Sequence, residues 1–242
     1  MHKLRLAWMY PNLLNLHGER GSIQALVKTG ENLGLEMEVV RIEDFSQSVP
    51  FQDFDLVVFL PGEMSTFRYL IPALQSQKDA LDAYLKSGGY LLALGTSGLL
   101  FGKTVTREDQ STFEGLGYLD MCATERKYVW GDDLHFRLND TQMELVGPQI
   151  QMADVDAKQP LGTTIYGRGN NATGTEGARW KNLIYTNCLG PLFVKNPWFA
   201  EDILKNICLQ KFLELSQKTP HQIAADSFRS TLSFIEKKPK NA

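Results

Sequence analysis

The turn Gly95-Thr96-Ser97-Gly98 is the part of this sequence best placed to do chemistry. It follows a fully apolar segment, residues 90–94, and precedes a second apolar stretch, so it joins a buried strand to a predicted helix. Such a turn can present a nucleophile where the N–H groups of a helix N-terminus stabilise an anion. Ser97 is the obvious nucleophile, apart from Thr96, although Leu99 stands where a Gly-x-Ser-x-Gly elbow has its second glycine. An ordinary tight crossover that needs two glycines explains the same residues equally well.

A serine nucleophile also requires a base, which is usually a histidine. Of the four histidines, only His17 falls in a loop on the ligand side of the predicted sheet. His135 lies between two apolar residues of an alternating stretch and is expected on a solvated strand face. His2 is terminal, and His221 belongs to the C-terminal helices. No metal-ligand spacing stands out, so we expect neither a metal site nor a cofactor.

The elements that would position these residues predict an α/β fold with a doubly wound sheet. Strands are expected at 3–9, 36–42, 55–60 and 90–94, with helices at 22–33, capped by Ser22, and at 64–86. This alternation is typical of parallel central strands covered on both faces. Ligands of such sheets bind beyond the carboxyl ends of the strands. Further strands are expected at 118–123, 134–138, 143–151 and 183–186, and helices at about 197–215 and 220–237.

The composition is that of an ordinary soluble globular chain. The 242 residues carry a net charge of −3, which gives no basic field for nucleic-acid binding. No apolar run approaches the ~20 residues of a membrane span, and no signal-peptide core is present at the N-terminus. The three cysteines form neither a C-x-x-C pair nor an even disulfide framework. We therefore expect a cytoplasmic protein whose main domain, 1–204, carries a packed helical extension, 205–242.

Five segments, taken in order, resemble the CobB/CobQ-type class I glutamine amidotransferases, and within them the GatD-type subunits of lipid II isoglutaminyl synthase. Each segment is weak alone, but together they span some 200 residues. The resemblance implies a flavodoxin-like three-layer sandwich with a mostly parallel central sheet. It also implies a Mur-ligase-like, MurT-type partner subunit in the amidation of cell-wall (peptidoglycan) precursors. The segments are YPNLLNLHGERGSI (10–23), DLVVFLPGEMST (55–66), FEGLGYLD (113–120), GRGNN (167–171) and EGARWKNLIYTNCLGPL (176–192).

The sequence departs from this family at the residues that do the chemistry. The family elbow reads Cys-Gly-Gly-x-Gln, and its cysteine forms a glutamyl thioester; here Gly95 stands at the cysteine position and Leu99 at the glutamine position. The family's Leu-His-Gly-Pro stretch, whose histidine activates the cysteine, places Leu189 at the base position. The neighbouring Cys188 should point to the opposite face and so not replace the missing thiol.

The turn that supplies an oxyanion-hole amide in the family is altered too. Pro61 replaces a glycine there and has no N–H to donate, although Gly62 still can. The resemblance places Gly62, Thr96 and Ser97 in the substrate-binding site, together with Arg126, which lies near the family's substrate-holding arginine.

Two hypotheses from different classes follow. In the first, the chain is a glutaminase-dead amidotransferase-like subunit with a structural or regulatory role, or with another small ligand in its vestigial pocket. In the second, it is a hydrolase of the same fold that uses Ser97 as its nucleophile. A third reading, in which the chain senses or channels ammonia made elsewhere, has no sequence feature that separates it from the first.

Overall fold

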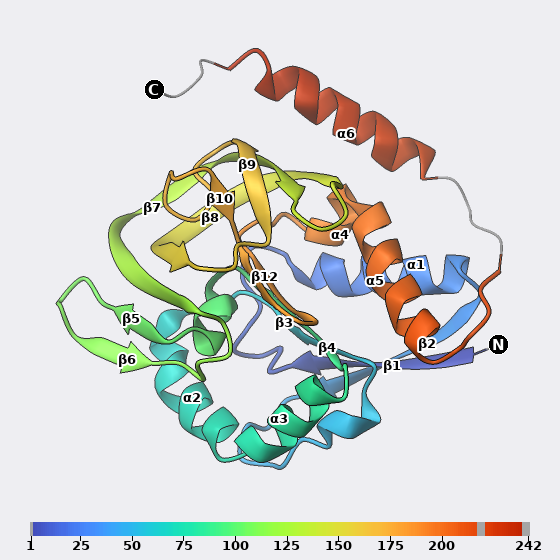
Figure 1. Cartoon of the computed structure of the whole chain (residues 1–242), viewed down its shortest axis with the longest axis horizontal. Coiled ribbons are helices and arrows are strands. Elements are labelled where there is room, and N and C mark those ends of the chain that lie inside the picture. Colours follow the sequence, from blue (N-terminus) through green and yellow to red (C-terminus); the bar gives the residue numbers. More distant parts are fainter. Residues whose placement is uncertain (1, 217–220, 239–242) are drawn as a thin grey trace.

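A six-stranded sheet forms the centre of the molecule. The computed structural model describes residues 2–216 and 221–238. The strand order is β11-β12-β4-β3-β1-β2, and every neighbouring pair is parallel except β11 with β12 (Figure 1). The strands are β1 (His2–Met9), β2 (Leu35–Ile42), β3 (Leu56–Phe59), β4 (Tyr90–Leu94), β11 (Ala178–Trp180) and β12 (Leu183–Thr186).

A second sheet lies beside the first (Figure 1). Its order is β10-β9-β7-β5-β6, and β8 pairs with β7 as a long antiparallel ribbon. The strands are β5 (Thr104–Thr106), β6 (Thr112–Glu114), β7 (Met121–Leu138), β8 (Glu144–Ala157), β9 (Gly162–Tyr166) and β10 (Thr175–Glu176).

Helices cover both faces of the central sheet (Figure 1). Helices α1, α4 and α5 contribute to one core cluster, and α2 and α3 to the other. The α-helices are α1 (Arg20–Asn32), α2 (Phe67–Gln75), α3 (Lys78–Lys86), α4 (Leu192–Lys195), α5 (Pro197–Gln210) and α6 (Gln222–Ile235), and the 3₁₀ helices are η1 (Phe51–Asp53), η2 (Met64–Thr66) and η3 (Gly95–Phe101).

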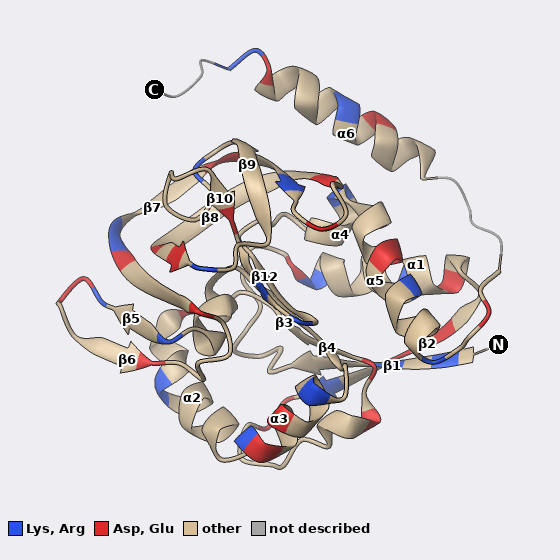
Figure 2. Ribbon diagram, viewed as in Figure 1, with Lys and Arg blue, Asp and Glu red and all other residues tan. Residues whose placement is uncertain are grey.

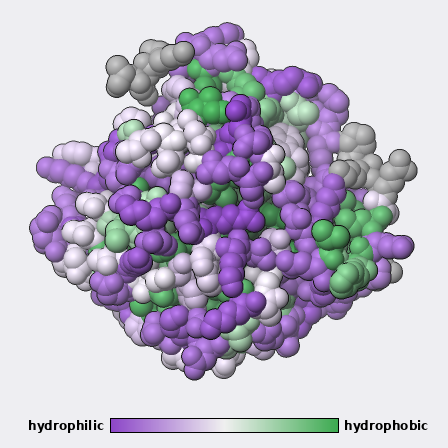
Figure 3. Space-filling model, in the orientation of Figure 1, coloured by the Kyte–Doolittle hydropathy of each residue, from purple (hydrophilic) through white to green (hydrophobic). Residues whose placement is uncertain are grey.

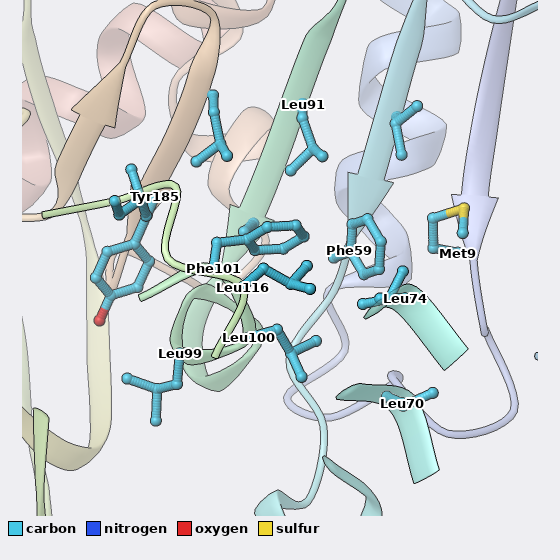
Figure 4. Packing of buried hydrophobic residues seen from close by; sticks show 14 of the residues in the cluster. Met9, Phe59, Leu70, Leu74, Leu91, Leu99, Leu100, Phe101, Leu116 and Tyr185 are labelled. Atoms are coloured by element: carbon cyan, nitrogen blue, oxygen red, sulfur yellow. The ribbon is translucent and has the colours of Figure 1, made fainter. Parts of the chain in front are cut away.

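The central strands are buried on both sides because each residue face packs against a helical layer. In β3, Val57 and Phe59 belong to the core under α2 and α3, whereas Leu56 and Val58 belong to the core under α1 and α5. The Phe101 ring at the end of η3 packs edge-to-face on Phe59, with 5.0 Å between ring centroids (Figure 4). This contact ties the helix after β4 to the end of the central strand β3.

The central strands, the α/β alternation and the first helix are confirmed, but several other expectations are wrong. The segments 118–123 and 134–138 are not separate strands, because one continuous strand, β7, covers 121–138. The expected helix 64–86 is divided into η2, α2 and α3. The helix expected at 197–215 ends at residue 210, and Pro220 lies outside the described residues. Strands β5, β6, β9, β10 and β11 were not anticipated.

Helix α6 runs along the outside of the molecule, away from the central sheet (Figure 1). Residues 204 and 205 both belong to α5. In α6 the Phe228 ring meets the Trp198 ring at 5.1 Å, and beyond the helix the Nζ of Lys238 lies 2.6 Å from carboxylate oxygens of Asp132 and Asp133. Apolar side chains of α6, notably Ile223, stay exposed. Figure 3 shows green, hydrophobic surface at the top of the molecule, where α6 lies.

Within the described ranges, 2–216 and 221–238, the structure has no helix that is both long and apolar enough to span a bilayer.

Candidate functional site

Four loops meet at the carboxyl edge of the central sheet. They follow β1 (residues 10–19), β3 (60–63), β4 (η3) and β12 (187–191). The N–H of Leu16 in the first loop donates to the Pro61 carbonyl oxygen at 2.9 Å, which ties the first two loops together. This is the edge at which an open α/β sheet binds ligands.

Gly95, Pro61 and Leu189 converge at the centre of this edge. Gly95 has a φ of +56°, a left-handed conformation that favours glycine. A Cβ added to it would lie 3.1 Å from Cγ of Pro61 and 3.5 Å from Cδ2 of Leu189. Leu189 itself has no exposed surface. The two positions at which the resemblance places a nucleophile and its base therefore face each other, and both carry groups that cannot react.

The amide of Gly62 is already occupied. Its N–H donates to Oγ1 of Thr96 at 3.1 Å, and the Thr96 hydroxyl donates in turn to the Gly62 carbonyl oxygen at 2.6 Å. The Leu14 side chain packs so closely that its Cδ2 would stand 2.3 Å from a Cβ at Gly62. An oxyanion could reach this donor only if Thr96 first released it.

Ser97 points into the protein. Its side chain is fully buried, and its Oγ lies 3.0 Å from the carbonyl oxygens of both Phe59 and Leu94. The hydroxyl thus holds the turn after β4 against the end of β3. His17, the histidine expected on the ligand side, is solvent-exposed in the loop after β1. The structure records no hydrogen bond between His17 and Ser97 among the described residues.

Glu19 is a site residue that the sequence reasoning missed. Its carboxylate has no exposed surface and accepts hydrogen bonds from the N–H of Gly190, from the N–H of Leu192 at 3.3 Å and from Oγ of Ser22 at 2.9 Å. Burial raises the pKa of Glu19, and these hydrogen bonds oppose that rise. Glu19, not Ser22, precedes α1, so Ser22 is not the N-cap residue. A carboxylate just ahead of a helix, in a Gly-rich loop of the resembling segment, was the available signal.

A second buried carboxyl, that of Glu176 in β10, holds the same loop from its other end. Oε1 accepts from Oγ1 of Thr186 at 2.7 Å and from the N–H of Asn187 at 2.6 Å. Complete burial raises the pKa of Glu176 to about 7. The loop that carries Leu189 is therefore fixed between two buried carboxyl groups.

Cys188 does not supply the missing thiol. Its Sγ is buried against Gly147 of β8, where it would lie 2.8 Å from an added Cβ, while Leu189 faces Gly95. Burial raises the pKa of the Cys188 thiol well above its usual value, which keeps it protonated and unreactive.

Arg126 and His135 take part in ion pairs of the second sheet. Arg126 Nη1 donates to both carboxylate oxygens of Asp154, at 3.0 and 2.8 Å, and Arg168 binds the same carboxylate. His135 is only 8% exposed, and its Nε2 lies 3.0 Å from Oε2 of Glu144. The expectation of a solvated His135 is wrong, because α6 covers this strand face and Phe228 meets the imidazole ring edge-on.

No group of three or more His, Cys, Asp or Glu side chains suited to a metal ion occurs in the part of the chain that the structure describes. At this edge the positions that the family resemblance assigns to the nucleophile and its base hold Gly95 and Leu189, and the turn beside them holds Pro61.

Comparison with known proteins identifies two relatives that cover most of the chain. Both are named lipid II isoglutaminyl synthase (glutamine-hydrolyzing) subunit GatD. The protein from Streptococcus pneumoniae is 25% identical over 219 residues, 87% of this chain and 83% of its own length. The protein from Staphylococcus aureus is 25% identical over 220 residues, 90% of each chain. No family model matches the sequence.

Solved structures share the fold at lower sequence identity. A glutamine amidotransferase superposes with a TM-score of 0.51 at 10% identity, covering 83% of this chain and 98% of its own. The glutaminase domain of Trypanosoma brucei CTPS, solved with bound acivicin, gives a TM-score of 0.53 at 9% identity, covering 90% and 98%. The chain is thus similar in sequence to GatD subunits, and it has the α/β fold of the class I glutamine amidotransferases, with a mostly parallel central sheet.

Proposed function

We propose that this protein is a GatD-like subunit without glutaminase activity. In this proposal it associates with a Mur-ligase-like, MurT-type subunit that amidates a cell-wall precursor, and it acts there as a structural or regulatory component in the cytoplasm. The similarity to two GatD subunits over most of the chain supports the role.

One observation carries the proposed loss of activity. Gly95 and Leu189 face each other at the elbow, with Pro61 packed between the same loops. A glutaminase of this type needs a thiolate to form the acyl intermediate and a base to activate it. Residues of such a pair act as a unit, so their joint loss removes several powers of ten in rate. The Thr96 hydroxyl adds to the effect, since it occupies the Gly62 amide.

The direct test is ammonia and glutamate release from glutamine by the purified protein, alone and with its cognate Mur-ligase-like subunit. We expect no release above a protein-free control in either case, and no labelling by an electrophilic glutamine analogue. Stable co-elution of the two chains is expected in the same experiment. Turnover of glutamine by the purified chain would overturn the proposed inactivity, and failure of the chains to associate would overturn the proposed role.

The rival hydrolase hypothesis has no observation in its favour. Ser97 is buried and hydrogen-bonded to two carbonyl oxygens, and His17 is exposed in another loop. A fluorophosphonate probe that labels Ser97 in the native protein would revive it.

A further inference from the structure

A groove lies between α2 and the β5–β6 hairpin, beside the elbow. Its volume is about 480 Å³, and its lining starts at Met64, two residues after Gly62. Phe67 and Phe113 form its apolar floor, with their rings edge-to-face at 6.0 Å between centroids. The groove therefore opens at the same edge of the sheet as the candidate site.

Arg68 stands on the rim of this groove without an anionic partner. Among residues 2–216 and 221–238 no carboxylate forms a salt bridge with it, and its guanidinium lies over the Tyr69 ring at 4.8 Å. The other arginine in the lining, Arg107, is already neutralised, since its Nε donates to Glu125 at 2.5 Å. Glu114, also in the lining, accepts hydrogen bonds from the Thr104 hydroxyl. Helix α2 carries a blue, basic segment in Figure 2.

Exposed aromatic surface continues from Arg68. Tyr69 is 49% exposed and stacks on Phe45, with 6.2 Å between ring centroids. Arginine, tyrosine, phenylalanine and methionine are enriched in protein interfaces, and tyrosine and arginine are among the residues that contribute most to binding. We call Phe45, Arg68, Tyr69 and the adjoining groove the α2 surface.

We propose that the α2 surface docks the Mur-ligase-like subunit, which inserts a segment carrying an acidic side chain between apolar ones. The acidic group pairs with Arg68, whose charge is otherwise unmatched, and the apolar groups fill the groove over Phe67 and Phe113. Docking here also covers the elbow, because the groove and the elbow share one edge of the sheet. This inference rests on the proposed function, as it names the surface through which the proposed partner binds.

The experiment measures the affinity of the full-length chain for its cognate Mur-ligase-like subunit by titration calorimetry. Arg68→Glu reverses the unpaired charge, and Tyr69→Ala removes the exposed ring; we expect each to weaken binding at least about tenfold. The matched control is Arg229→Glu, the same charge reversal on the exposed helix α6, where Arg229 pairs with Asp226. Its affinity should stay within about twofold of wild type.

The outcomes separate this inference from the proposed function. If wild type binds the partner and both α2-surface variants bind equally well, the inference fails and the proposed function stands. The inference also fails if Arg229→Glu weakens binding as much as Arg68→Glu, since the effect would then reflect net charge alone. If wild type does not bind the partner, both the proposed function and this inference fail. Thermal unfolding of each variant confirms that the changed affinity comes from a folded protein.

Discussion

Leu189 packs against Gly95: its Cδ2 would lie 3.5 Å from a Cβ on Gly95. The relationship links two loops that are 94 residues apart in sequence, one after β4 and one after β12, which are adjacent parallel strands. The two positions at which the family resemblance places a nucleophile and its base therefore lie side by side.

Restoring these groups should restore the reactivity of a thiol. In Gly95→Cys combined with Pro61→Gly, adding Leu189→His places an imidazole beside the thiol and lowers its pKa. We expect alkylation of the introduced thiol by iodoacetamide at pH 7 to be at least about tenfold faster with the histidine than without it. Site-resolved mass spectrometry separates this thiol from the exposed Cys122. Equal alkylation rates in the two variants would show that a histidine at position 189 does not activate a thiol at position 95.

Gly95→Ala should destabilise the protein through both backbone strain and contact. The φ of +56° disfavours any side chain, and the new methyl would meet Pro61 at 3.1 Å. We expect a loss of about 2 to 3 kcal/mol in the free energy of unfolding, measured by urea denaturation. Gly117→Ala is a matched control, because Gly117 has a φ of +75° with no atom within 4 Å of an added Cβ. It should cost only about 1 kcal/mol, and an equal cost at both sites would exclude the Pro61 contact.

Glu176 should make stability depend on pH. Burial raises its folded-state pKa from 4.5 to about 7, so the folded protein holds a proton that the unfolded chain releases. Its contribution to stability is thus fully present below pH 4.5 and is lost as the pH rises through 7, by about 3 kcal/mol in total. Glu176→Gln keeps the acceptor for Thr186 and Asn187 but cannot ionise. We expect urea denaturation to show that the unfolding free energy of this variant, relative to wild type, is higher at pH 8 than at pH 5. The same difference at both pH values would contradict the prediction.

Glu19→Ala should loosen the loop after β12. The change removes the acceptor for the Gly190 and Leu192 amides and leaves both donors inside the protein. We expect a loss of about 2 to 4 kcal/mol in unfolding free energy and faster hydrogen exchange of these two amides. The matched control is Glu31→Ala, which removes an exposed carboxylate whose ion pair is with Lys28. It should change the unfolding free energy by less than about 0.5 kcal/mol. Unchanged exchange at Gly190 would mean that Glu19 does not hold this loop.

The central sheet could be predicted because its residues obey simple rules. The segment LVVFL (56–60) is apolar at every position, and the structure buries all four residues of β3. The second sheet was harder, since β7 passes through exposed residues such as Tyr128 and Val129 that break any alternation. A register shift between Glu125 and Trp130 marks the irregular part of the strand. Local pattern cannot show that one long ribbon crosses such a stretch.

The candidate site was only partly readable for a similar reason. The order of the strands and loops along the chain was enough to predict that Gly95 and Leu189 lie at one edge, because parallel strands end at the same side of the sheet. It could not show that Ser97 turns inward, that Thr96 binds Gly62, or that Arg126 is held by Asp154. Each of these is a contact between residues at least 28 positions apart, or a choice of rotamer, which the sequence alone does not encode locally.

The reciprocal hydrogen bonds between Thr96 and Gly62 have a consequence for nitrogen supply. Under the proposed function they keep the Gly62 N–H bound to Thr96, and the subunit supplies no ammonia from glutamine. Amidation by the proposed complex would therefore use dissolved ammonium. Its rate would rise with the ammonium concentration and would not depend on glutamine. In the proposed complex the chain would then be a rigid, non-catalytic subunit beside the synthetase, and the ammonium would come from the surrounding solution.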